Sequence, residues 1–300
     1  MKYVIASTAV TDEIRAADGK QVGKVAGGAG IYALCGIKLW DDDVMLATGV
    51  GEDYKDIYGS WYEKNNLTMD GLILKDPKTP HTIIQYFADG EREETPLYGP
   101  DHYLRVEITP EELKPYFKQA KGIYIFKNSD SKFWEQILEI KKNSSAKVMW
   151  EIANDATYLD NLAEVERIAK KLDIFSINLT EAKRLFGLDD LNEMIKAYQT
   201  WDIPLVFLRR GSKGSIMITK DQAVTVPSEK DVNIVDPTGG GNSSSGAVLC
   251  GFCEGKDLES CAIMGNLSAV MCLSQYGVPE YIDKVLQMEA KKRLYEEKTC

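Results

Sequence analysis

Short, continuous apolar runs recur along the chain, with helical segments between them. The runs are rich in β-branched and aromatic residues and lack polar alternation, which favours strands that are buried on both faces. They are YVIAS at 3–7, VMLAT at 44–48, GIYIF at 122–126, KVMWE at 147–151, IFSIN at 174–178 and PLVFL at 204–208. Strands that alternate with helices predict an α/β fold, in which a mostly parallel sheet is wrapped by helices.

One of the intervening segments, TPEELKPYFKQA at 109–120, has a clear helix start. Thr109 can cap the helix, Pro110 fits its first turn, and Glu112 completes a capping box. The pattern predicts a helix over 109–120.

Two segments, residues 12–26 and 80–98, break the alternation. Each holds an Asp-Gly pair between short alternating runs, which is typical of a β-hairpin. We expect the two hairpins to lie outside the main sheet and to meet as a small β lid. The sequence has no internal repeat and no Pro- or Gly-rich linker, so residues 1–300 are expected to form a single domain with this lid inserted.

Composition narrows the possible partners. The 36 Lys and Arg against 46 Asp and Glu give a formal net charge of -10, which argues against a nucleic-acid or anionic-membrane partner. No signal peptide and no run of 18 apolar residues is present. The cysteines are expected to be buried thiols in a reducing compartment, and hence the protein to be cytoplasmic. They are Cys35, Cys250, Cys253, Cys261, Cys272 and Cys300.

Cys250 and Cys253 form a C-x-x-C pair, but no second pair with zinc spacing follows. Because Gly251 and Phe252 between them continue an apolar helix, a redox or metal role is disfavoured.

The stretch VDPTGGGNSSSGAVLCGF at 235–252 sets consecutive glycines before an expected helix. Gly239, Gly240 and Gly241 can turn several N–H groups toward one point, and the following helix adds the partial positive charge of its N-terminus. This arrangement predicts an anion-binding loop. A tight turn with no ligand is the alternative.

Two further segments carry candidate chemistry. In INLTEAKRLFG, Asn178 ends a strand and Glu181 follows, a pair that can hold a hydrated Mg²⁺ near phosphates. Ordinary capping of the helix by Asn178 or Thr180 is the alternative. In LRRGSKGSIMI, Arg209 closes a strand and residues 211–214 turn the chain into the next one, which on its own also fits a hairpin turn with solvated charges.

Taken in order, five motifs resemble those of the ribokinase-like (PfkB) carbohydrate kinase family over nearly the whole chain. They are GGAGIYALCGIKLW, ATGVGEDYKDIYG, NLTEAKRLFG, LRRGSKG and DPTGGGNSSSGA. The resemblance implies a three-layer sandwich with a mostly parallel sheet of about nine strands and a β lid. It also implies transfer of the γ-phosphate of ATP, with Mg²⁺, to a hydroxyl of a sugar or nucleoside. It is also compatible with a bound monovalent cation and with a homodimer formed through the lid.

The resemblance assigns roles to individual residues. By this comparison Gly239, Gly240 and Gly241 form the anion hole, next to the catalytic position 242. Asn178 and Glu181 organise Mg²⁺ and phosphate, with Glu181 as the metal residue. The residues that would contact the nucleotide are Arg209, Gly211 and Gly214. Those that would contact the acceptor are Asp12, Gly27, Gly28 and Tyr32.

Several positions depart from the family pattern. Asn242 stands where the family has an Asp that accepts the proton of the attacking hydroxyl, and an amide can orient that hydroxyl but cannot take its proton. Arg209 replaces a usual Thr, Tyr32 replaces a usual Asn, and WEIAND at 150–155 lacks the arginine common after that strand. Several departures together favour a naturally divergent branch over a single engineered change.

Two functions therefore remain open: an ATP-dependent kinase, which we expect, and a catalytically impaired module that binds nucleotide or sugar. Two interpretations of Tyr32 also remain open, because its ring can stack on an acceptor or pack inside its helix.

A Rossmann dinucleotide fingerprint is a rival interpretation of GGAGIYA, because Gly28, Gly30 and Ala33 match G-x-G-x-x-A. The context disfavours it, since the preceding segment is polar and the strand that ends near Thr48 carries no acidic residue for a ribose.

Overall fold

The computed structural model describes residues 1–87, 92–230 and 232–299. The strands of its main sheet are β1 (Tyr3–Ala6), β4 (Val44–Gly51), β5 (Leu72–Asp76), β8 (Gly122–Lys127), β9 (Lys147–Ile152), β10 (Ile174–Asn178), β11 (Leu205–Arg209), β12 (Ser215–Ile218) and β13 (Ala223–Val226). They are ordered β13-β12-β11-β10-β9-β8-β1-β4-β5. Neighbours from β5 to β11 run parallel, and β12 and β13 are antiparallel additions at one edge.

All six predicted strands are present, and the one predicted at 44–48 continues to Gly51. β5 and β13 were not predicted. β5 ends in charged residues and β13 alternates between exposed and partly buried positions, so neither reads as a continuous apolar run.

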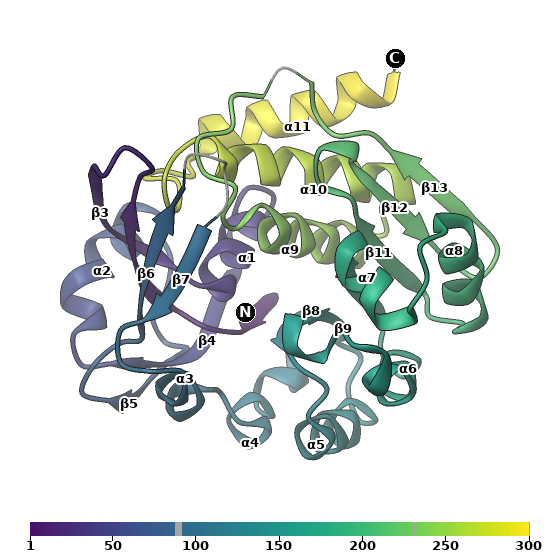
Figure 1. The fold of residues 1–300 in the computed structure, drawn as a ribbon, viewed down its shortest axis with the longest axis horizontal. Coiled ribbons are helices and arrows are strands. Elements are labelled where there is room, and N and C mark those ends of the chain that lie inside the picture. Colours follow the sequence, from purple (N-terminus) through teal and green to yellow (C-terminus); the bar gives the residue numbers. More distant parts are fainter. Residues whose placement is uncertain (88–91, 231, 300) are drawn as a thin grey trace.

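Helices cover both faces of the sheet (Figure 1). One layer consists of α1 (Ala29–Lys38), α2 (Tyr54–Lys64), α9 (Gly240–Cys253), α10 (Leu258–Leu273) and α11 (Lys284–Thr299). The other consists of α3 (Asp101–Val106), α4 (Pro110–Leu113), α5 (Ser131–Lys141), α6 (Leu162–Ala169), α7 (Leu179–Phe186) and α8 (Leu191–Thr200). Alternate strand residues enter the two cores: Tyr3 and Ile5 of β1 face one, and Val4 and Ala6 the other. This is the expected three-layer α/β sandwich.

A second sheet forms the lid. Its strands are β2 (Val10–Arg15), β3 (Gln21–Gly27), β6 (His81–Tyr86) and β7 (Arg92–Pro96), in the order β3-β2-β6-β7. Each hairpin is antiparallel, and β2 and β6 join them by parallel pairing. The first hairpin turns at Asp18 and Gly19, as expected, while the Asp-Gly pair of the second, residues 89 and 90, lies outside the described residues. β3 is a lid strand and not a strand of the main sheet, so the topology does not fit the rival dinucleotide fingerprint.

The helix predicted over 109–120 is much shorter than expected. Its capping box is confirmed, because Thr109 accepts a hydrogen bond from the Glu112 N–H and Glu112 accepts one from the Thr109 N–H. The α-helix nevertheless ends at Leu113, and a separate 3₁₀ turn covers Tyr116–Lys118. Pro115 accounts for the break, because proline has no N–H to donate to the carbonyl oxygen four residues before it.

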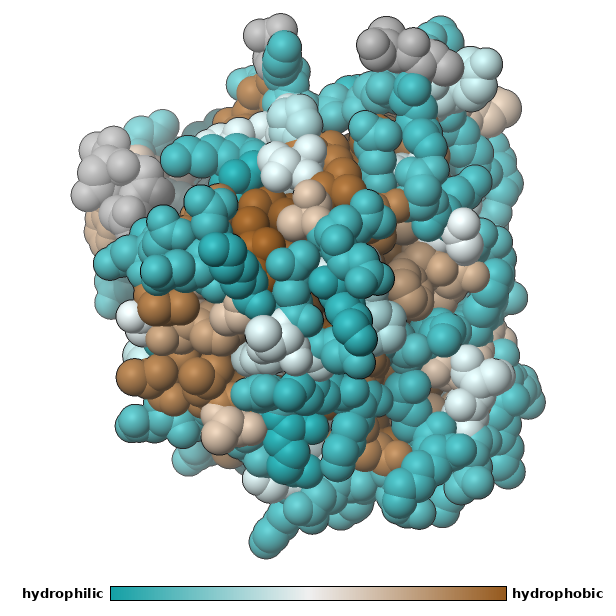
Figure 2. Space-filling view, turned by 90° about the vertical axis from the view of Figure 1, so that its right-hand side faces the viewer, coloured by the Kyte–Doolittle hydropathy of each residue, from teal (hydrophilic) through white to brown (hydrophobic). Residues whose placement is uncertain are grey.

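Cys35, Cys250, Cys261 and Cys272 are buried free thiols, as expected. Cys253 is also a free thiol but is only partly buried, and Cys300 lies outside the described residues. None of the helices in the described parts of the chain combines the length and apolar character needed to cross a bilayer. The side of α8, β12 and β13 is mostly hydrophilic with small apolar groups between the polar ones (Figure 2).

Close packing against α1 fixes the position of α9. A Cβ atom at Gly36 of α1 would lie 2.0 Å from the carbonyl oxygen of Ser243, and one at Gly246 of α9 would lie 2.4 Å from that of Ala33. Both helices therefore need a residue without a side chain where they cross. At the sheet side, the hydroxyls of Ser245 and Ser176 are 2.8 Å apart, which ties α9 to β10.

We predict that Gly36→Ala lowers the free energy of unfolding by at least about 1–3 kcal/mol, because overpacking forces the two helices apart. Gly59→Ala in α2 is the matched control, since its Cβ would lie 3.6 Å from the nearest atom, on Lys55. It should be neutral or stabilising by up to about 1 kcal/mol. Urea denaturation measures both, and equal effects would contradict the packing argument.

Candidate functional site

The N-terminus of α9 is open to a ligand. Its N-cap, Gly239, has φ 80° and ψ -9°, a left-handed conformation that glycine adopts at little cost, and no side chain among the described residues caps the helix. Ser243, Ser244 and Ser245 donate their hydroxyls to the carbonyl oxygens of Gly240 and Gly241, away from the free N–H groups. A helix start with unpaired N–H groups and a positive dipole end is suited to an anion.

The helix begins earlier than the sequence suggested. Gly240, Gly241 and Asn242 already form its first turn, so only Gly239 remains in the loop.

A cavity of about 680 Å³ lies beside this helix start. Six of the predicted site residues line it: Asn178, Arg209, Gly211, Gly214, Gly240 and Gly241. Apolar walls come from Phe207, Ile234 and Leu273, and α10 adds Asn266 and Ala269. A cleft of this size, with apolar walls and a few polar groups at one end, suits a nucleotide-sized ligand.

Asn178 and Glu181 form a capping box at the start of α7. Oδ1 of Asn178 accepts from the Glu181 N–H at 2.9 Å, and Oε2 of Glu181 accepts from the Asn178 N–H at 2.9 Å. The structural alternative for Asn178 is thereby confirmed. Oε1 of Glu181 accepts no hydrogen bond from the described residues, and burial raises the pKa of this carboxyl. Glu181 thus offers one carboxylate oxygen in a partly buried position.

A second carboxylate, Glu151 at the end of β9, is the centre of a buried polar network. Its Oε1 lies 3.0 Å from Nη2 of Arg209 and 3.0 Å from Nδ2 of Asn242, and its Oε2 accepts from the Tyr124 hydroxyl at 2.8 Å. Glu151 is only 2 % exposed. Burial, and then the charge of Glu151, raise the pKa of Tyr124, so its hydroxyl remains a donor. All three partners donate, which suits an ionised carboxylate.

Sequence reasoning missed Glu151 and Tyr124. The one available signal was a charged residue inside the apolar run KVMWE, where an unpaired carboxylate would be costly.

Arg209 links this network to the open helix. A Cβ atom at Gly241 would lie 2.0 Å from Nη1 of Arg209, so the guanidinium packs directly on that glycine. Nη2 also lies 3.9 Å from Oε2 of Glu181. Arg209 therefore brings a positive charge to the place where the glycines leave N–H groups free.

The predicted acceptor residues gather at the base of the lid. A Cβ atom at Gly27 would lie 1.7 Å from Oδ2 of Asp12, so the Asp12 carboxylate rests on the glycine backbone. Asp12 lies inside lid strand β2 and is 4 % exposed. The next residue, Gly28, has φ 92°, and a Cβ atom there would lie 2.7 Å from the Thr8 carbonyl oxygen.

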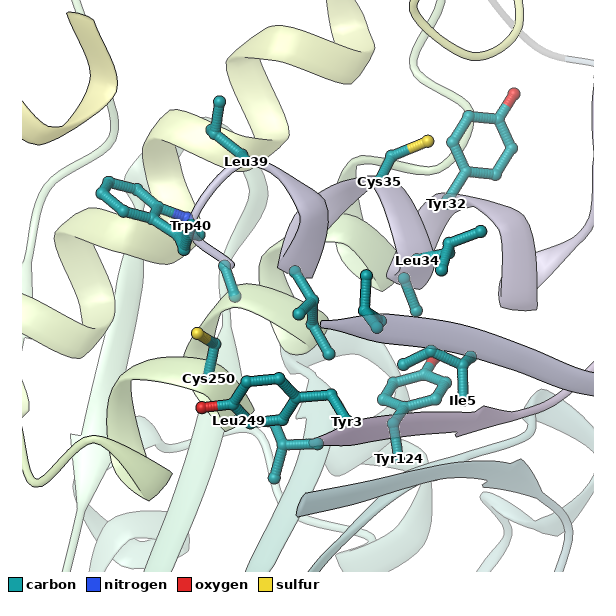
Figure 3. Packing of buried hydrophobic residues seen from close by; sticks show 14 of the residues in the cluster. Tyr3, Ile5, Tyr32, Leu34, Cys35, Leu39, Trp40, Tyr124, Leu249 and Cys250 are labelled. Atoms are coloured by element: carbon teal, nitrogen blue, oxygen red, sulfur yellow. The ribbon is translucent and has the colours of Figure 1, made fainter. Parts of the chain in front are cut away.

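Tyr32 packs inside the protein and offers no open face for stacking. It is 1 % exposed, and a Cβ atom at Gly239 would lie 2.0 Å from its Cδ1. Figure 3 shows its hydroxyl directed away from the strand of Tyr3 and Ile5. The hydroxyl has no hydrogen-bond partner among the described residues. Burial raises its pKa well above the ordinary value, with smaller contributions from the charges of Asp12 and Asp236.

Asp236 joins the lid to the glycine loop. Tyr86, the last residue of β6, donates its hydroxyl to Oδ1 of Asp236 and lies 2.9 Å from the hydroxyl of Thr238. The same Oδ1 accepts from the Thr238 N–H at 2.9 Å. Asp236 is 1 % exposed and was not predicted as a site residue. The lid and the anion loop thus meet through one carboxylate.

Residues 3–284 match the model of the pfkB family of carbohydrate kinases. The chain belongs to this family. It is 27 % identical over 286 residues to a cytidine kinase of Thermococcus kodakarensis, covering 87 % of this chain and 91 % of that protein.

Solved structures agree with the fold. An adenosine kinase from Sinorhizobium meliloti superposes with a TM-score of 0.80 at 18 % identity, covering 97 % of this chain and 99 % of that one. An E. coli protein assigned as a ribokinase II, solved with ATP and Mg²⁺, gives 0.77 at 16 % identity, with 97 % and 98 % covered. The pfkB assignment rests on the family match and the ribokinase-like fold on these superpositions.

We predict that Asn178→Ala costs about 1 kcal/mol of stability, as loss of an N-cap does. Asp190→Ala is the matched control, because Asp190 caps α8 by accepting from the Glu193 N–H at 2.9 Å. Both variants should lose similar stability in urea titrations, but only Asn178→Ala, which borders the cavity, should also weaken nucleotide binding in calorimetry. Equal nucleotide affinities would assign Asn178 a capping role alone.

Proposed function

We propose that this pfkB-family protein transfers the γ-phosphate of ATP to a hydroxyl of a nucleoside or sugar. The observation that carries the proposal is the juxtaposition of the 680 Å³ cavity, the uncapped N-terminus of α9 and the Arg209 guanidinium. An elongated ligand with an apolar end and an anionic end is complementary to this arrangement.

The nucleotide would lie in the cavity with its base between Phe207 and Leu273 and its phosphates at Gly239–Gly241. Gly211 and Gly214 shape the turn on the opposite wall. Because phosphoryl transfer depends mainly on positioning and charge stabilisation, the free N–H groups and Arg209 supply what the reaction needs most.

The described residues fit a Mg²⁺ ion. In the part of the chain that the structure describes, no three His, Cys, Asp or Glu side chains gather as a metal cage. Mg²⁺ needs none, since it commonly keeps several waters and binds through one or two carboxylates and the substrate's phosphates. Glu181, with its unpaired oxygen, would hold it. When bound, the ion would neutralise charge on the phosphates.

The acceptor would lie at the base of the lid, where the Asp12 carboxylate can accept hydrogen bonds from two neighbouring hydroxyls. Kinship with a cytidine kinase makes nucleosides the first class to test. The resemblance and the composition support four further proposals. The chain forms one functional domain and is cytoplasmic. It also binds a monovalent cation and forms a homodimer through the lid edges β3 and β7.

A second candidate is a module that binds nucleotide or sugar without turnover. Asn242 at the catalytic position favours it, since an amide cannot take the proton of the attacking hydroxyl.

We predict ADP formation from ATP and Mg²⁺ only when a suitable acceptor is present. The measurement is a coupled ADP assay over nucleosides, including cytidine and adenosine, and simple sugars, with thermal shifts alongside. A ligand at a hundred times its dissociation constant adds about 2.7 kcal/mol to stability, which a shift detects readily. ATP binding without turnover on any acceptor would select the binding module. No nucleotide binding at all would exclude both the kinase and a nucleotide-binding module, and would leave only a module that binds sugar.

We also predict that Ala269→Leu raises the ATP dissociation constant about tenfold or more, because the larger side chain overfills the cavity wall. The control is Ala197→Leu, on a half-buried position of α8 that does not line this cavity. Calorimetry with ATP should separate the two, and equal affinities would place the nucleotide elsewhere.

A further inference from the structure

The carboxylate that position 242 lacks is present one hydrogen bond away. Oε1 of Glu151 lies 3.0 Å from Nδ2 of Asn242 and 4.0 Å from the place where a Gly241 Cβ atom would be. Glu151 therefore borders the first turn of α9, although it belongs to β9 and is separated from Asn242 by 91 positions in the sequence.

This contact explains why residue 242 is an amide. An Asp at 242 would set two carboxylates about 3 Å apart, and like charges at that distance cannot both ionise. Asn242 has nearly the same shape and donates an N–H to the Glu151 oxygen. The identities of the two residues are thus coupled, with the negative charge on the strand and the neutral amide on the helix.

We propose that Glu151 is the proton acceptor of the transfer site, with Asn242 as its positioning partner. This rests on the proposed kinase function. The acceptor's O–H bond breaks as its oxygen bonds to the γ-phosphorus, and the bond from that phosphorus to the β,γ-bridging oxygen breaks, its electron pair leaving with ADP. The proton passes to Oε1 of Glu151, and the neutral carboxyl returns it to water after product release.

Arg209 controls when Oε1 of Glu151 is available to accept a proton. Its guanidinium holds Oε1 of Glu151 at 3.0 Å. Arg209 also lines the nucleotide cavity, and guanidinium groups bind phosphate strongly and in a bidentate manner. A bound triphosphate competes for Arg209, which leaves Oε1 with the Asn242 donor and a free lone pair. The proton acceptor thereby becomes available when nucleotide is present.

The test compares the protein with Glu151→Gln, Asn242→Asp and the double variant Glu151→Gln/Asn242→Asp. We expect Glu151→Gln to lower kcat by about 10² to 10⁴, the usual range for loss of a general base. Asn242→Asp alone should give no gain in kcat and should lower the melting temperature, because it places two carboxylates together. The double variant moves the charge back to the helix and should regain most of kcat.

Asp173→Asn is the matched control for loss of a buried, paired acid. Asp173 is 6 % exposed, and its carboxylate lies 2.8 Å from Lys141 and 3.1 Å from Lys147. It directly precedes β10, at the end of that strand opposite to Asn178. It should lose stability and keep kcat. Glu151→Asp keeps the carboxylate and should fall between the parent and Glu151→Gln, and melting curves with ATP affinities show that each variant is folded.

Unchanged kcat in Glu151→Gln, or a rise of 10² or more in Asn242→Asp alone, would overturn this proposal while leaving the kinase function intact. Failure of the parent protein to turn over any acceptor while it binds ATP would overturn the kinase function itself, and Glu151 would then be only the partner of a buried ion pair.

Discussion

The crossing of α9 with α1 is the contact on which the rest of the site depends. Because Gly36 and Gly246 have no side chains, the backbones of the two helices can pack directly against each other. The contact between Ser176 and Ser245 fixes α9 against β10. Because a helix is rigid over its first turn, this crossing determines where the free N–H groups of Gly240 and Gly241 point. The anion site, the network around Glu151 and the packing of Tyr32 under Gly239 all follow from that placement.

Charge balance at the carboxyl end of the sheet is the second constraint. Two carboxylates, Glu151 and Glu181, lie near one guanidinium, and their distances to Arg209 are 3.0 and 3.9 Å. Removing one partner of a buried pair typically costs about 3–5 kcal/mol, because the remaining charge stays desolvated. Arg209 thus holds the two carboxylates of this site together, and any anion that binds Arg209 must compete with them.

The sequence allowed the architecture to be predicted well, because strands buried on both faces leave continuous apolar runs such as YVIAS and IFSIN. Local signals also predicted the glycine turn before α9, the capping residues of α4 and α7, and the lid hairpins. The helix over 109–120 was wrong in length because Pro115 outweighed a good capping box. The role of Glu151 could not be predicted, since its partners Tyr124, Arg209 and Asn242 come from three other elements and no spacing along the chain brings them together. The contact of Asp236 with the lid could not be predicted for the same reason, because its partner Tyr86 belongs to a distant strand.

The lid and the start of α9 meet at residues 236–239. Asp236 and Thr238 contact the lid through Tyr86, while Gly239 rests on the Tyr32 ring and begins α9. Any movement of the lid away from this loop therefore breaks the hydrogen bond between Tyr86 and Asp236. Such a shared element couples two ligands when its arrangement differs between the open and closed lid, and the coupling is reciprocal for binding free energies. In this protein the candidate element is short and is built around the buried carboxylate of Asp236, which accepts from both Tyr86 and the Thr238 N–H.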